Sequence, residues 1–109
     1  MSLEEQAILV LVTAGSQADA DIIATALVEQ RLAACVAIAP IQSIYRWQGK
    51  IERDSEWQLT IKTAASQLAT VQELVQQLHP YDVPEVLAVP VMGGSEDYLT
   101  WLLGQVGQE

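Results

Sequence analysis

The chain has 109 residues, of which 50% are hydrophobic and 17% are charged, and its formal net charge is −9. This length suits one domain, residues 1–109, with one hydrophobic core. The charged fraction lies below the roughly 25% of an average globular chain, which predicts that part of the surface is buried between subunits. Nucleic acid and acidic membrane lipids are not expected as partners, because both are bound through Lys and Arg, and only five such residues are present.

Cysteine content and apolar runs indicate the compartment. Cys35 is the only cysteine, so an internal disulfide cannot form and a reducing compartment is expected. Residues 1–6 contain no basic side chain and so do not resemble a secretory signal. The apolar runs are short and are interrupted by prolines and glycines, so no membrane-spanning helix is expected. Together these features predict a soluble, cytoplasmic protein.

The first elements follow from an apolar run and a cap. Residues 7–12 are continuously apolar, which predicts a strand buried on both faces. Ser16 with Asp19 three positions later resembles a capping box and predicts a helix that continues to about Gln30. Arg31 then suits the negative end of the helix dipole.

Residues 33–63 indicate one long β-hairpin with a turn at residues 48–50. In the return arm Trp57, Leu59 and Ile61 alternate with polar residues, which predicts a strand with one buried face. Each arm is about twice the usual strand length of about five or six residues. A proline within the first arm, and a change of apolar phase there, predict a bulge or bend near residues 38–43.

The far end of this hairpin carries large apolar side chains, among them Tyr45 and Trp47. A domain of this size has no local core to cover them. An exposed apolar edge invites aggregation, so another subunit is expected to cover it. The chain is therefore predicted to be an obligate oligomer.

After the hairpin, Ser66 is expected to cap a second helix with an apolar stripe. This helix should end near Leu78, because His79 precedes a proline and is steered away from helical torsions. Residues 79–85 then form a stiff loop with two prolines.

The last strand is expected at residues 86–91, where Pro90 lacks a donor and marks a sheet edge. Ser95 should cap a short third helix. Its buried side is expected to carry Tyr98, Trp101 and Leu102, and the tail at residues 105–109 is expected to fray.

The elements alternate as strand, helix, strand, strand, helix, strand, followed by an extra helix. With right-handed crossovers this order predicts an α+β, ferredoxin-like βαββαβ sandwich with an antiparallel sheet and the two main helices on one face.

His79 is the only histidine, and its imidazole could bind a metal or relay protons near neutral pH. The alternative is a helix-end histidine bonded to a backbone carbonyl. Cys35 could supply a thiolate for copper, or it is a buried filler. Glu56 and Lys62 share the polar face of the return arm, where a charge pair, a ligand clamp or a subunit contact would each explain them.

Five segments carry a resemblance to a known family. They are residues 31–36 (RLAACV), 43–51 (SIYRWQGKI), 56–63 (EWQLTIKT), 79–85 (HPYDVPE) and 98–101 (YLTW). In this order and spacing they are similar to CutA, the divalent-cation tolerance protein family, and the resemblance covers residues 9–103.

The resemblance implies a ferredoxin-like fold and a tight homotrimer in which the long hairpin arms pair across subunits. It also implies a link to tolerance of copper and other divalent cations, with metal binding associated with the histidine that matches His79. Some members carry a second histidine where this chain has Leu78, and some carry a cysteine, proposed as a copper ligand, where it has Val12. The architecture also resembles that of the PII signalling trimers, which bind small ligands between subunits.

We therefore expect a cytoplasmic homotrimer that responds to divalent metal ions, with copper or another divalent cation bound weakly at His79. One alternative is a small-molecule sensor with its site in a cleft between subunits. The residues expected near that cleft are Trp47, Glu56, Lys62, Tyr81 and Glu85. Another is a structural or interaction module whose product is the trimer itself. No nucleophile–base arrangement, phosphate loop, CxxC or HExxH motif is present, so no enzyme is expected.

Overall fold

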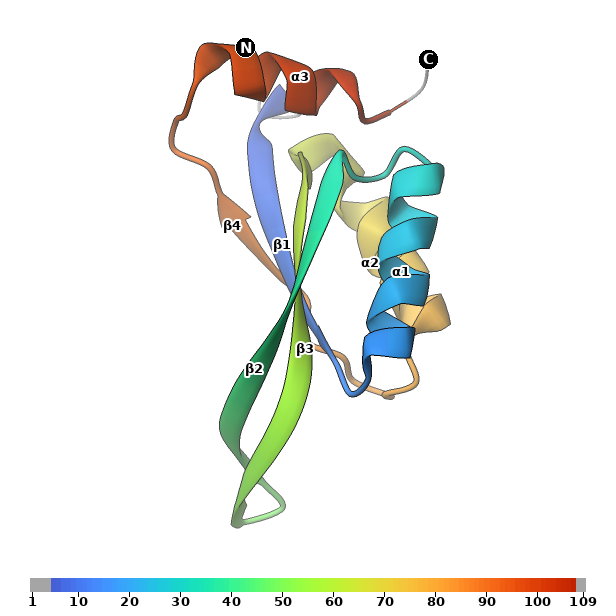
Figure 1. The fold of residues 1–109 in the computed structure, drawn as a ribbon, viewed down its shortest axis with the longest axis vertical. Helices are drawn as coiled ribbons and strands as arrows, with labels where there is room; N and C mark the ends of the chain where they lie inside the picture. The colour runs from blue at the N-terminus through green and yellow to red at the C-terminus, as the bar shows by residue number, and fades with distance from the viewer. Residues whose placement is uncertain (1–4, 108–109) are drawn as a thin grey trace.

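The computed structural model describes residues 5–107, and within them four strands form one antiparallel sheet in the order β2-β3-β1-β4 (Figure 1). The elements in chain order are β1 (Ala7–Ala14), α1 (Gln17–Glu29), β2 (Cys35–Trp47), β3 (Lys50–Ala64), the 3-10 turn η2 (Ala65–Gln67), α2 (Leu68–Leu78), β4 (Leu87–Pro90) and α3 (Glu96–Gly104). This order and sheet topology confirm the ferredoxin-like fold. Among residues 5–107, no helix is both long enough and apolar enough to cross a membrane.

Helices α1 and α2 cover one face of the sheet, and the core lies between them and the strands (Figure 1). Its fully buried side chains include Val10, Val12, Ile23, Leu27, Leu59, Ile61, Val71 and Val75. Burying one such side chain stabilises the fold by about 1.5–3 kcal/mol. The alternation predicted for the return arm is confirmed, because Leu59 and Ile61 face the helices and Trp57 packs at the edge of the same core.

The two faces of β1 differ, contrary to the expectation that both are buried. Leu9 and Leu11 are only half-buried, since the sheet face opposite α1 and α2 is covered within this chain only where α3 crosses one end (Figure 1). We call this the open face.

Most helix boundaries agree with the sequence. Ser16 caps α1 by accepting a hydrogen bond from the Asp19 N–H at 3.1 Å. The backbone of His79 is extended (φ −79°, ψ 133°), so α2 ends at Leu78 as predicted. The cap expected from Ser66 is wrong, because the turn η2 precedes α2 and the helix starts without a side-chain cap.

Arg31 adopts a left-handed backbone conformation (φ 59°) and holds the end of the described chain. Its guanidinium donates to the carbonyl oxygens of Gly107 and Gly104 at 3.1 and 3.2 Å, and the Gly107 N–H donates back to the Arg31 carbonyl at 2.9 Å. Residues 105–107 are therefore tied down and do not fray. Arg31 also serves the carboxyl end of α3, and not that of its own helix. Residues 108–109, and residues 1–4 of the segment considered for a signal, lie outside the described residues.

The long hairpin has an unbroken register from the Cys35–Lys62 pair to the Trp47–Lys50 pair. Of the predicted bulge or bend, the bulge is therefore wrong, because no extra residue interrupts the pairing. Pro40, opposite Trp57, is tolerated because β2 is an edge strand. The two strands twist across each other and continue well past the helices (Figure 1). Gln48 and Gly49 close the hairpin with positive φ angles of 49° and 79°, as a type I′ turn requires.

Several large apolar side chains remain uncovered within this chain. At the far end of the hairpin Ile44, Trp47 and Ile51 are 60%, 58% and 64% exposed. Of the three residues expected on the buried side of α3, only Leu102 is buried, whereas Tyr98 and Trp101 remain more than 40% exposed. Pro90 ends β4, which is an edge strand as predicted.

Candidate functional site

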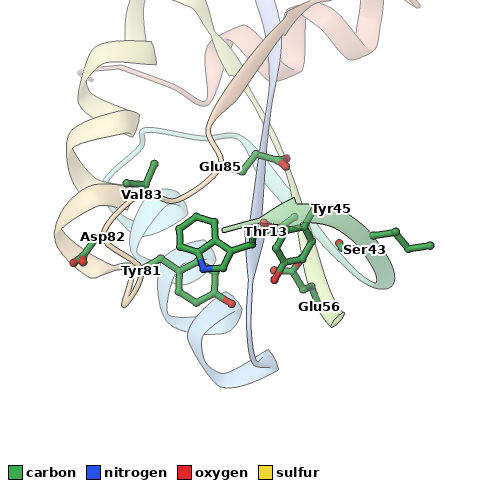
Figure 2. A pocket seen from close by; sticks show the side chains of 10 residues that line it. Thr13, Ser43, Tyr45, Glu56, Tyr81, Asp82, Val83 and Glu85 are labelled. Atoms are coloured by element: carbon green, nitrogen blue, oxygen red, sulfur yellow. The ribbon is translucent and has the colours of Figure 1, made fainter. Parts of the chain in front are cut away.

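A groove of about 740 Å³ lies between the far half of the hairpin and the loop that follows α2 (Figure 2). Its lining comprises Thr13, Ser43, Ile44, Tyr45, Trp47, Glu56, Tyr81, Asp82, Val83 and Glu85. The end of β1, both hairpin strands and the loop each contribute, so the groove exists only because the fold brings these segments together.

Four of the five residues proposed for a ligand cleft line this groove: Trp47, Glu56, Tyr81 and Glu85. Lys62 does not. It lies six residues from Glu56 along β3, about 20 Å away. Its Nζ atom is 3.4 Å from the hydroxyl of Tyr98 and 5.6 Å from the centroid of that ring.

His79 anchors the loop side of the groove. Its side chain is buried, with Nε2 2.7 Å from the carbonyl oxygen of Thr13, and Nδ1 accepts the Tyr81 N–H at 3.1 Å. Because Nδ1 accepts, the proton of the neutral ring lies on Nε2, which donates to Thr13. Both ring nitrogens therefore form hydrogen bonds. This arrangement agrees with the alternative stated from the sequence, a histidine at a helix end bonded to a backbone carbonyl. A metal at His79 would displace one of these bonds.

Tyr81 forms a wall of the groove directly over the end of β1. Its ring centroid lies 4.7 Å from that of His79, with the ring planes tilted by 54°. A β-carbon on Gly15 would lie 2.8 Å from the Tyr81 hydroxyl oxygen, closer than non-bonded atoms approach. A glycine at this position therefore lets the ring settle against the backbone.

The groove is electrostatically negative. Partial burial, followed by the charge of Glu56, raises the pKa of Glu85. Burial also raises the pKa of Tyr81, with further contributions from Glu56, Asp54 and Asp19. The hydrogen bond that Tyr45 donates to Asp54 raises the pKa of Tyr45 to about 12. Each shift favours the protonated form, and the neighbouring carboxylates add to the effect of burial or of the hydrogen bond in each case.

The two metal candidates from the sequence lie apart. Cys35 is half-buried and pairs with Lys62, which in turn pairs with Leu9 of β1. His79 bonds Thr13, which lies four residues, or about 13 Å, from Leu9 along β1. Residues 5–107 contain no group of three or more His, Cys, Asp or Glu side chains arranged to hold a metal ion.

Six lining residues were not among those expected at the cleft: Thr13, Ser43, Ile44, Tyr45, Asp82 and Val83. Gly15, which supports the wall, was not expected there either. Thr13 supplies the carbonyl that holds His79, and Gly15 supplies the space that Tyr81 needs. The one local signal is that a glycine follows directly after a strand. Nothing local links it to a ring 66 positions later.

The family model described as "CutA1 divalent ion tolerance protein" matches residues 8–105. The chain belongs to this family. It is 48% identical over 100 residues to the "Divalent-cation tolerance protein CutA" of Thermus thermophilus, covering 91% of this chain and 97% of that protein. It is also 48% identical to "Protein CutA, chloroplastic" of Arabidopsis thaliana, covering 87% of this chain and 53% of that protein.

The fold agrees with solved CutA structures. CutA1 from Oryza sativa superposes with a TM-score of 0.92 at 40% identity, covering 99% of this chain and all of that chain. The resemblance read from the five sequence segments is thus confirmed. The description of the family and the name of the Thermus thermophilus relative refer to tolerance of divalent cations.

Proposed function

We propose that this chain acts in the cytoplasm as a homotrimer in cellular tolerance of divalent cations, copper among them. Membership of the CutA family supports the role in tolerance. The single cysteine supports a reducing compartment. The apolar surface that this chain leaves uncovered is the observation that supports the homotrimer.

That surface has two parts. The first is the open face, where Leu87 pairs with Leu11 and Val89 pairs with Leu9, and where Leu87 and Val89 are 57% and 40% exposed. The second is the far end of the hairpin, which extends past its own helices (Figure 1). Apolar patches on two sides of one chain suit contacts with two neighbours, as each subunit of a closed ring makes.

The mass of the protein in solution tests the assembly. Sedimentation equilibrium at micromolar concentration should give about 36 kDa, three times the chain mass of 11.9 kDa. A folded species at the mass of one chain would contradict the proposal.

Growth under metal stress tests the role in tolerance. Cells that lack this gene should grow more slowly than the parent strain in elevated copper, and expression of the intact chain should restore growth. Equal growth of the two strains in copper, zinc and cadmium would contradict a role of this protein in tolerance of divalent cations.

Direct binding of copper at His79 is the narrower form of this function. A copper ion there must compete with the bond to Thr13 or with the bond from Tyr81, so binding should be weak. Calorimetric titration of the wild type, His79→Gln and Cys35→Ser with Cu²⁺ tests it. The hypothesis expects a loss of affinity in His79→Gln and little change in Cys35→Ser.

A second candidate function is small-molecule sensing, and the groove beside Tyr81 favours it. A volume of about 740 Å³ lies within the range of about 300–1,000 Å³ usual for ligand sites. A thermal-shift screen of charged and neutral metabolites on the assembled protein tests this function. If no ligand stabilises the protein, a purely structural or interaction role of the assembly remains.

A further inference from the structure

The charge of the groove restricts what it can bind. Of the ten described residues that line it, three are charged, and all three are acidic: Glu56, Asp82 and Glu85. Asp82 points away from the other side chains, whereas Glu56 reaches in from the hairpin and Glu85 extends from the loop (Figure 2). An anionic ligand would meet only like charge here, and Lys62, the one cation expected nearby, lies by α3.

Among residues 5–107, no basic side chain lines the groove beside the two inner carboxylates. The charge of Glu56 disfavours ionisation of Glu85, which contributes to the raised pKa of Glu85. A cation placed between them would relieve this repulsion and would favour both ionised forms.

The remaining walls suit a cation with an apolar body. Trp47, Tyr45 and Tyr81 present aromatic rings, and Ile44 and Val83 add aliphatic surface. A cation over an aromatic face gains about 0.5–1 kcal/mol at exposed sites and about 2 kcal/mol when desolvated. A Ca²⁺ ion takes about six to eight oxygen ligands, and residues 5–107 hold no group of three or more acidic, His or Cys side chains placed to hold a metal ion.

We propose that the groove binds an organic ammonium ion, with its charge between Glu56 and Glu85 and its hydrocarbon part against Trp47 and Tyr81. This inference rests on the small-molecule function proposed above and assigns the ligand class of the same site. The positive centre satisfies two carboxylates, and the hydrocarbon part packs on those surfaces of Trp47 and Tyr81 that line the groove.

Three probes that share a benzene ring and differ in charge test which sign of ligand charge the groove prefers. They are benzyltrimethylammonium, benzyl alcohol and phenylacetate, each titrated calorimetrically into the full-length assembled protein. We expect the ammonium ion to bind at least tenfold more tightly than the alcohol, phenylacetate not to bind, and the affinity of the ammonium ion to fall as salt is added.

Two variants and a matched control test the position. Glu56→Gln and Glu85→Gln keep the side-chain shape and remove one charge each, so each should weaken the ammonium ion about tenfold. Glu73→Gln removes one exposed charge on α2, outside the groove, and should leave affinity within twofold. Equal loss in all three variants would mean that only net charge matters and would overturn the site.

The possible outcomes distinguish failure of the ammonium ligand from failure of the proposed small-molecule function. Tighter binding of phenylacetate or benzyl alcohol would overturn the ammonium ligand and keep a small-molecule groove. Displacement of the ammonium ion by micromolar Cu²⁺, with the same sensitivity to Glu56→Gln, would make the groove a metal site and overturn the inference. No binding of any probe, with the groove filled by a second copy of the chain, would remove the small-molecule function as well.

Discussion

The hydroxyl oxygen of Tyr81 lies 2.8 Å from the position that a β-carbon would take on Gly15. The loop after α2 therefore contacts the chain just after β1 through the Tyr81 hydroxyl oxygen, which leaves no room for a side chain at position 15. The same loop is held by His79, whose ring bridges the Thr13 carbonyl and the Tyr81 N–H. The wall of the groove is thus set by contacts between segments about 66 residues apart, and each contact can be broken separately.

Gly15→Ala should push the Tyr81 ring out of place and destabilise the protein by about 1–3 kcal/mol, as overpacking does. Gly15→Ala with Tyr81→Phe should recover most of the loss, because the next ring atom lies at an ordinary 3.7 Å. Urea unfolding at fixed protein concentration measures both. Gly93→Ala, where an added β-carbon meets nothing within 4 Å, is the control. Equal stability of the single and double variants would show that the hydroxyl is not the obstacle.

His79→Ala should destabilise the fold by about 1–3 kcal/mol for each group left unpaired, here the Thr13 carbonyl and the Tyr81 N–H. The free energy of unfolding in urea measures the loss. Leu78→Ala, one position earlier and 37% exposed, should cost less. If His79→Ala costs no more than that control, water replaces both bonds and His79 does not anchor the loop.

Tyr45 should titrate near pH 12, because its ionisation breaks the bond to Asp54 and adds a negative charge beside three carboxylates. The folded pKa is raised above the unfolded value, so the stabilisation is present below about pH 10 and is lost as the pH rises toward 12. Ultraviolet absorbance of the phenolate follows the titration. Asp54→Asn should move it to lower pH, whereas Tyr45→Phe should abolish it.

Glu85→Gln should stabilise the protein slightly at pH 7. The folded pKa of Glu85 is raised, so its ionisation opposes folding, and stability falls as the pH rises through the window above its ordinary value of 4.5. The gain should stay under about 1 kcal/mol, because the side chain is largely solvated. It should vanish below about pH 4, where wild-type Glu85 is protonated as well. Thermal melts at pH 4 and pH 7 compare the two, and a gain equal at both pH values would assign it to packing and not to charge.

Trp47→Ala tests the covered hairpin. Within one chain this side chain is 58% exposed, so its removal should cost little unless a neighbour buries it. In the proposed trimer the cost should approach about 3–5 kcal/mol, typical of a buried large aromatic. Melting temperatures should then depend on protein concentration and fall in the variant. Ile22→Ala, on the outer side of α1 and 57% exposed, provides the comparison, and a similar small loss in both would leave the hairpin uncovered.

Local patterns in the chain predicted most of the fold. Alternation at Trp57, Leu59 and Ile61 decided the face that β3 buries, since successive side chains of a strand point to opposite sides. Ser16 supplied a cap, and the proline after His79 ended α2, because each acts on backbone groups a few residues away. These signals can be read from the sequence because each depends only on residues within about one helical turn of each other.

Contacts between distant segments were decided only by the tertiary structure. The packing of the loop after α2 against the far half of the hairpin put Glu56 in the groove, whereas Lys62, about 20 Å farther along β3, lies beside Tyr98 of α3. Pro40 keeps the register because β2 lies at a sheet edge, and Arg31 reaches Gly107 because α1 and the end of α3 meet. The space that Gly15 leaves for Tyr81 is of the same kind. A side chain's neighbours across the fold depend on how whole elements pack, and no window of neighbouring residues carries that information.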